Sequence, residues 1–238
     1  MSSRTSFLSF LLFLISTKSL STGTVLTAMI LGTRLPYPNN CTRPYHLPGE
    51  DVITLFGSCR EYPNENKDIL RFRMSTDTIE KVGELPDNTN RGTVQPGSVG
   101  YIYYLGGSNN LIYRYHPGPN TTETGGVFPF NLRDSTSISL NVTDDEVIIF
   151  GGYGIPNAVY ALNLATLTVQ YEATLPINIL EATSVRVGDY AFIFDSGASK
   201  DNRQAISTGN SGQFEKFHNR ACRTADPSRF FVETFLRL

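Results

Sequence analysis

Side chains that could do chemistry are few in this chain, and their spacing matches no catalytic site. Three adjacent carboxylates, Asp144, Asp145 and Glu146, could bind a cation or raise the pKa of one member through like-charge repulsion. A solvated turn between strands explains them better. The three histidines are widely scattered, and no Cys or His pair has metal-ligand spacing. We therefore expect no catalytic residue, no metal site and no cofactor.

Two further motifs exclude common enzyme classes. The segment Gly151-Gly152-Tyr153-Gly154 lies between two strand patterns, whereas a dinucleotide-binding turn opens a helix. No Gly-x-Ser-x-Gly motif occurs, so a serine hydrolase of that class has no support. The formal net charge is −2 and the arginines form no basic patch, which argues against nucleic acid as a partner. The sequence is more informative about the scaffold than about activity.

Four short apolar runs recur along the chain and predict the elements that would position any site. They end at Phe56, Leu105, Phe150 and Phe194, which are 49, 45 and 44 positions apart. Periods of this size are typical of repeated supersecondary units that bury their apolar faces only against neighbours. The runs cover residues 52–56, 101–105, 147–150 and 190–194.

A second strand pattern, with strict alternation of apolar and polar residues, follows each of the first three runs. Its markers Leu70, Tyr113 and Tyr160 are 43 and 47 positions apart. The units close with the same spacing at three prolines: Pro86, Pro129 and Pro176. A further strand candidate precedes each apolar run. Four antiparallel strands per unit predict the blades of a β-propeller.

Glycine doublets make the repeat more specific. Gly106-Gly107 and Gly151-Gly152 directly follow apolar strands, and Tyr113 and Tyr160 come six to eight residues after them. Together with the closing strand, these features resemble the kelch repeat family over roughly residues 45–197. The chain departs from the family because it has no tryptophan, and Gln170-Tyr171 stands near the expected position. The first doublet is degraded to Gly57-Ser58.

The resemblance implies an all-β fold of kelch-type β-propeller blades, with about three complete four-stranded blades, part of a fourth, and an incomplete ring. The function that we expect is a non-catalytic module that binds an extracellular protein or a glycan. The alternative is a fragment of an extracellular enzyme, of the sialidase or galactose oxidase kind, that lacks its catalytic blades. Loops 58–68, 108–111 and 153–157 should open on one rim, where Tyr62 and Tyr153 could contact a partner.

The first 21 residues have the pattern of a secretory signal peptide. A short polar start with Arg4 precedes an apolar stretch over residues 7–15, which is too short to span a bilayer. No other stretch is apolar enough for a membrane span, so we expect a secreted protein. Glycosylation triplets begin at three asparagines: Asn40, Asn120 and Asn141. Asn120 and Asn141 fall at predicted turns and are the favoured sites.

Three cysteines in a secreted chain leave one without an intramolecular partner. A Cys41–Cys59 disulfide would attach the N-terminal arm, residues 22–44, to the first blade. A Cys59–Cys222 bridge between the first and last blades is the rival pairing, and the sequence does not decide between them.

The length of the chain poses a difficulty, because kelch-like rings usually contain more blades. Three explanations stay open. Residues 25–31 could supply a missing strand, self-association could bury the open ends, or the sequence could be a truncated or misassembled gene product, which we favour. The repeats stop after Gly197, and residues 198–238 form a polar tail. Asp226-Pro227 resembles a helix start and predicts a short helix over residues 228–238.

Overall fold

The computed structural model describes residues 33–36, 41–47, 49–59, 65–141, 145–187, 190–194, 205–208, 214–217 and 234–237. Every regular element within these ranges is a β-strand. That part of the chain contains no helix of the length and hydropathy needed to cross a membrane. The expected strand at residues 25–31 lies outside the described residues.

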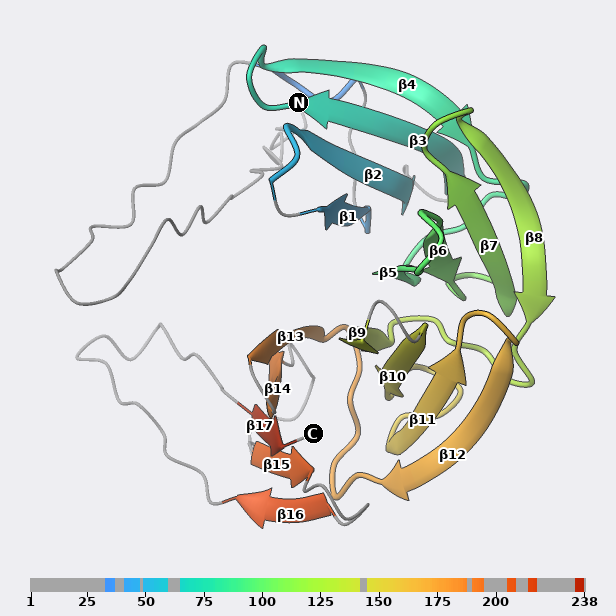
Figure 1. The fold of residues 1–238 in the computed structure, drawn as a ribbon. Helices are drawn as coiled ribbons and strands as arrows, with labels where there is room; N and C mark the ends of the chain where they lie inside the picture. The colour runs from blue at the N-terminus through green and yellow to red at the C-terminus, as the bar shows by residue number, and fades with distance from the viewer. Residues whose placement is uncertain are drawn as a thin grey trace, which may run out of the picture.

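Three four-stranded antiparallel sheets follow one another along the chain, each with its strands in sequence order. The first contains β1 (Arg43–His46), β2 (Val52–Cys59), β3 (Glu65–Arg73) and β4 (Thr78–Glu84). The second contains β5 (Thr93–Pro96), β6 (Ile102–Leu105), β7 (Leu111–His116) and β8 (Thr121–Val127). The third contains β9 (Thr136–Asn141), β10 (Glu146–Phe150), β11 (Ala158–Asn163) and β12 (Thr168–Thr174). Figure 1 shows them side by side around a common centre, with β1, β5 and β9 innermost.

A fourth, smaller sheet continues the arc. It consists of β13 (Thr183–Val187), β14 (Tyr190–Phe194) and β17 (Thr234–Arg237), and β13 lies beside β9 at the centre (Figure 1). The strands β15 (Ala205–Thr208) and β16 (Phe214–Phe217) form a separate pair. The ring stays open between this end and the first sheet (Figure 1). The predicted propeller blades, three complete and one partial, are therefore confirmed.

The expected helix at the end of the chain is wrong for Thr234–Arg237, which forms β17. These residues pair antiparallel with β14, so that Phe235 lies opposite Phe192. A strand at the edge of a sheet carries unpaired N–H and C=O groups, and β17 supplies partners for those of β14. The helix signal at Asp226-Pro227 is local and gives no information about this distant partner.

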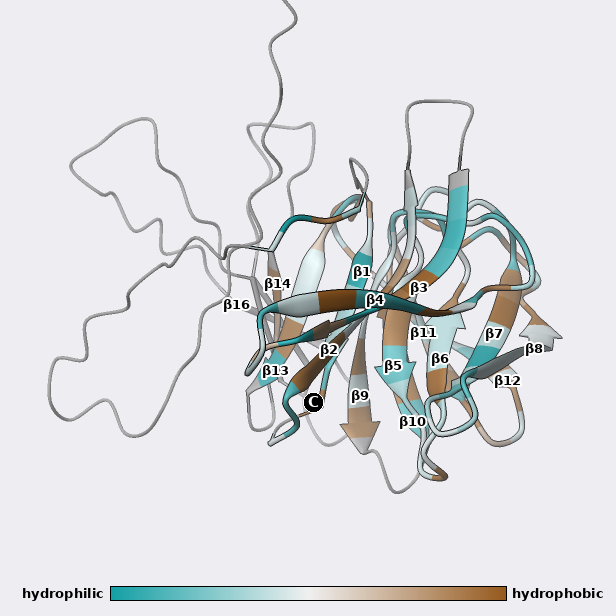
Figure 2. Cartoon of the chain, turned by 90° about the horizontal axis from the view of Figure 1, so that it is seen from above, coloured by the Kyte–Doolittle hydropathy of each residue, from teal (hydrophilic) through white to brown (hydrophobic). Residues whose placement is uncertain are grey.

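The blades are held together by apolar side chains that alternate between the two faces of each sheet. In β7, Tyr113 and Tyr115 pack toward Phe56 of the first sheet, whereas Ile112 packs toward Val147 of the third. All four residues of β6 are buried, as expected of a strand covered on both faces. Figure 2 shows brown, apolar segments on strands of all three blades, among them β3, β7 and β9.

The glycine doublets lie where the backbone needs a left-handed conformation. Gly151 and Gly152 have φ values of 58° and 110°, which side chains rarely adopt. A Cβ atom on Gly151 would overlap the carbonyl oxygen of Ile179. The same oxygen accepts a 2.9 Å hydrogen bond from the amide of Gly152. The doublet therefore lets one blade approach the linker of the next, as the sequence predicts.

Polar side chains connect the innermost strands across the blade boundaries. Gln95 Nε2 of β5 donates to the carbonyl oxygen and to Oγ of Ser137 in β9, at 2.8 Å each. Thr136 and Ser184 share a hydroxyl hydrogen bond of 2.7 Å between β9 and β13. Because these buried groups satisfy one another, the inner strands can approach closely without losing hydrogen bonds.

Candidate functional site

One rim of the propeller gathers the loops after the glycine doublets together with the linkers between blades. Thr93 at the start of β5 lies opposite Leu105 at the end of β6, and Thr136 lies opposite Phe150 in the same way. Loops 106–110 and 151–157 therefore open on the same rim as linkers 85–92 and 128–135. This arrangement confirms the prediction that loops 108–111 and 153–157 share a rim.

Four residues on this rim occupy equivalent places, two positions before each innermost strand. Cys41, Arg91, Asp134 and Glu181 all have positive φ, at 61°, 59°, 62° and 54°. The amide of Asp134 donates to the carbonyl of Arg91 at 2.9 Å, and the amide of Glu181 donates to the carbonyl of Asp134 at 3.0 Å. Main-chain hydrogen bonds at these positions thus link consecutive blades. Because the side chains take no part in these bonds, their chemical type can differ from blade to blade.

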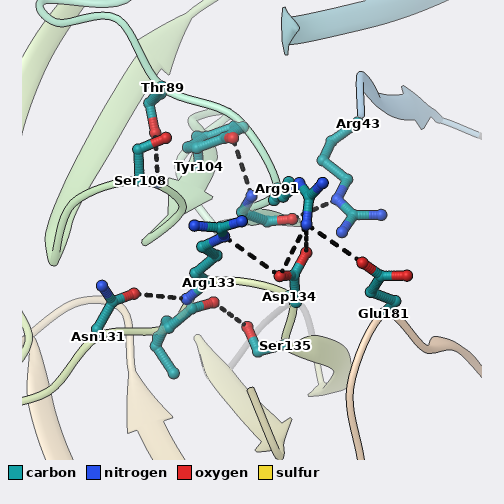
Figure 3. A network of polar contacts seen from close by, with 12 residues as sticks. Arg43, Thr89, Arg91, Tyr104, Ser108, Asn131, Arg133, Asp134, Ser135 and Glu181 are labelled. Atoms are coloured by element: carbon teal, nitrogen blue, oxygen red, sulfur yellow. Dashed lines mark hydrogen bonds and ion pairs between the residues drawn. The ribbon is translucent and has the colours of Figure 1, made fainter. Parts of the chain in front are cut away.

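At three of these positions, the side chains of Arg91, Asp134 and Glu181 converge into one charged network (Figure 3). Arg91 Nη1 lies 3.2 Å from Asp134 Oδ2 and 3.2 Å from Glu181 Oε1. Arg133 Nε lies 3.3 Å from the same oxygen of Asp134, whose side chain is only 9% exposed. One nitrogen of the Arg91 guanidinium therefore joins carboxylates from two other linkers.

Arg43, at the start of β1, adds a second positive group beside Arg91 (Figure 3). Its Nε donates to the carbonyl oxygen of Gly92. Among the described residues it forms no ion pair. We call the five side chains Arg43, Arg91, Arg133, Asp134 and Glu181 the mouth. With three guanidinium groups and two carboxylates, the mouth has a surplus of positive charge.

Tyr153 extends the mouth outward on the diglycine loop of the third blade. It is 71% exposed, and its amide donates to the carbonyl of Arg133 at 2.7 Å. The guanidinium carbon of Arg133 lies 5.9 Å from the centre of the tyrosine ring, within reach of a cation–π interaction. The predicted contact residue Tyr153 therefore lies beside charged groups, whereas Tyr62 lies outside the described residues.

Sequence reasoning missed the mouth, although a signal was present. Arg91, Asp134 and Glu181 each follow one of the prolines that close the units, always by five positions. They differ in chemical type, so they match no motif, and only the repeat register reveals their equivalence.

The solvated turn that we expected between β9 and β10 is wrong for Asp145, whereas Glu146 is exposed. Asp145 is buried, and its two oxygens accept hydrogen bonds of 2.6 Å from the amide and the hydroxyl of Ser98. This contact ties the turn to the β5–β6 turn of the preceding blade, which explains the aspartate structurally. Asp144 lies outside the described residues. Within the described ranges, no group of three or more His, Cys, Asp or Glu could hold a metal ion.

The opposite rim has a shallow hollow of about 340 Å³ on the outside of the second blade. It is lined in part by Tyr101, Arg114, His116 and Glu123. Arg114 pairs with Glu123 at 3.1 Å and lies over the Tyr101 ring at 5.7 Å. The cation of this hollow is therefore paired with a carboxylate, whereas the mouth also contains Arg43, for which no ion pair to a described residue is found.

The structure describes only some of the predicted glycosylation and disulfide sites. Asn120 is exposed in the turn between β7 and β8, whereas Asn141 is described only as the last residue of β9. Asn40 and Cys222 lie outside the described residues, as does the side chain of Cys59. The Cys41–Cys59 disulfide and its rival therefore stay predictions.

Comparison with known proteins supports the fold and leaves the family open. No family model matches the chain, and no curated protein matches it. Among solved structures, the chain is similar to one described as "Structure of YjhT", with a TM-score of 0.59 and 13% sequence identity. The match covers 70% of this chain and only 62% of that one. At this identity the similarity concerns the fold alone, and with the stacked four-stranded sheets it shows a β-propeller.

Proposed function

We propose that this protein is a secreted, N-glycosylated propeller of kelch type that acts as a non-catalytic interaction module. Its partner is an extracellular protein or glycan that carries acidic groups, and the binding surface is the mouth together with Tyr153. The observation that carries the proposal is the convergence of Arg91, Asp134 and Glu181 from three separate linkers. Loops and linkers on a rigid scaffold are common places for binding.

The chemistry of the mouth favours binding over catalysis. Both carboxylates already pair with arginine, so they are arranged to orient guanidinium groups and not to exchange protons with a substrate. Arg43 has no carboxylate partner among the described residues, and a guanidinium binds carboxylate or sulfate through paired hydrogen bonds. The exposed ring of Tyr153 adds a rigid contact surface, which is typical of interface hot spots.

The test is a binding screen with the protein secreted from eukaryotic cells, against extracellular proteins and glycans with and without acidic groups. We expect selective binding to acidic partners. Tyr153→Ala should weaken it by about tenfold or more, because hot-spot residues cost roughly 2 kcal/mol when truncated. Tyr171→Ala is the matched control, because Tyr171 is also exposed, at 52%, but lies on the outermost strand β12.

Two results would contradict the proposal. Equal losses for Tyr153→Ala and Tyr171→Ala would place the binding surface elsewhere on the blades. Turnover of a bound partner by the purified protein would show that the module is an enzyme.

A further inference from the structure

The turn between β7 and β8 carries Asn120, on the rim opposite the mouth. Asn120 has a φ of 55°, and the equivalent turns of the first and third blades end in Asp77 and Leu167, at 49° and 57°. The left-handed conformation is thus a property of the repeat. Because even leucine adopts it at the equivalent position, this conformation does not by itself require asparagine.

The carbonyl half of the Asn120 amide joins two blades. Its Oδ1 atom accepts a 2.9 Å hydrogen bond from Arg71 Nη2 on β3 of the first blade. The same oxygen accepts a 2.7 Å hydrogen bond from the hydroxyl of Tyr115 on β7. The peptide backbone of Asn120 lies against Gly83 of β4, so the residue occupies the outer end of the seam between these blades.

The nitrogen half of the same amide is unused. Asn120 is exposed, and Nδ2 makes no hydrogen bond to any described residue. In an Asn-x-Thr triplet, this nitrogen is the atom to which an oligosaccharide is attached. The triplet is completed by Thr122 on β8, whose hydroxyl donates to the carbonyl oxygen of Glu84 in the first blade.

We propose that Asn120 carries an N-linked glycan on Nδ2 while its carbonyl oxygen holds the seam between the first two blades. This inference rests on the proposed function, because the protein must be secreted for Asn120 to be glycosylated. In the transfer step, Nδ2 bonds to the anomeric carbon of a lipid-diphosphate-linked oligosaccharide. The bond from that carbon to the diphosphate breaks, the lipid diphosphate leaves, and Nδ2 loses one proton. The amide C=O is unchanged, so Oδ1 still accepts from Arg71 and Tyr115.

The position of this glycan is compatible with binding at the mouth. His116 pairs with Thr121 at the end of the blade where the Asn120 turn lies. Leu105 pairs with Ile112 at the opposite end, which faces the rim that carries the mouth. The sugar would extend from the rim away from Arg91 and Tyr153. Occupancy of Asn120 therefore shields the outer seam and leaves the mouth open.

The experiment uses the full chain secreted from eukaryotic cells. Removal of glycans by an amidase in heavy-oxygen water converts each glycosylated asparagine to a labelled aspartate, which peptide mass mapping locates. We expect the label at position 120, loss of one glycan's mass in Asn120→Asp, and its retention in Thr122→Ser. Asn120→Asp keeps an acceptor oxygen for Arg71, so its thermal midpoint should match that of the deglycosylated protein. Asn120→Ala should unfold several degrees lower.

The possible failures are distinguishable. Secreted protein that is labelled at Asn40 or Asn141 but not at Asn120 would overturn the inference alone. Protein that stays inside the cell with an intact leader and no label would overturn the proposed export and the inference together. Equal midpoints for Asn120→Ala and Asn120→Asp would refute the role of the carbonyl oxygen at the seam.

Discussion

Gly151→Ala should destabilise the protein much more than Gly100→Ala, although both glycines have positive φ, at 58° and 80°. A Cβ atom on Gly100 would meet nothing within 4 Å. A Cβ atom on Gly151 would overlap the carbonyl oxygen of Ile179 and lie 2.7 Å from its Cβ. The pair therefore separates the cost of backbone conformation from the cost of close packing between a blade and the next linker.

The magnitudes follow from the contacts. Left-handed backbone costs a non-glycine residue about 1–2 kcal/mol, and both variants lose this amount. Gly151→Ala must also push the Ile179 backbone away, and overpacking of this kind costs about 1–3 kcal/mol. The 2.9 Å hydrogen bond from Gly152 to Ile179 is then strained, which adds about 1 kcal/mol. We expect Gly151→Ala to lower the free energy of unfolding by about 2–4 kcal/mol more than Gly100→Ala.

Urea unfolding followed by tyrosine fluorescence measures this difference, because the chain has 12 tyrosines and no tryptophan. Tyr104, Tyr113 and Tyr115 are almost fully buried, so their emission should change when the blades separate. Equal losses for the two variants would refute the reasoning. They would show that the linker at Ile179 moves aside without cost and that the glycine is needed only for its φ.

Two further predictions concern the core and the inner strands. Burial raises the pKa of Tyr113 to about 12, so the native state keeps this phenol protonated where the unfolded chain already ionises. The contribution of Tyr113 to stability is complete below pH about 10 and falls by up to about 2–3 kcal/mol as the pH rises to about 12. Between these pH values, the free energy of unfolding should decline less steeply for Tyr113→Phe than for the unmodified protein. An identical decline would refute the raised pKa of Tyr113. Gln95→Met keeps the volume of the side chain but removes two hydrogen bonds to Ser137, so it should lower the free energy of unfolding by about 1–2 kcal/mol. An unchanged urea midpoint would show that these bonds are not needed between β5 and β9.

The blades could be predicted from sequence because the signals that define them are local. The apolar runs in β6 and β10 are buried on both faces, and a glycine doublet follows each of them where the strand ends. The alternation in β7 correctly separates Tyr113 and Tyr115 from Ile112, which pack on opposite faces. Strand and turn patterns depend on neighbouring residues, so one sequence is enough to reveal them.

The mouth and the last strand could not be predicted because they depend on distant partners. Arg91, Asp134 and Glu181 differ in type, and only the packing of three linkers brings them together. The sequence around Asp145 is typical of a solvated turn, and it contains no sign of Ser98, the hydrogen-bond partner of Asp145 in the preceding blade. The helix expected at β17 is wrong because 39 residues separate β17 from its partner β14, which lies beyond the reach of the local signal at Asp226-Pro227.

The amide of Asp134 donates to the carbonyl of Arg91, and the amide of Glu181 donates to that of Asp134, so these links use only main-chain atoms. Any amino acid that tolerates the left-handed conformation can occupy these positions without breaking the connection. Single substitutions at these positions would therefore change the charge of the proposed binding surface while the main-chain hydrogen bonds stay in place. The exposed Glu181 is the position where such changes cost least, because the buried Asp134 must still be matched to its arginine partners.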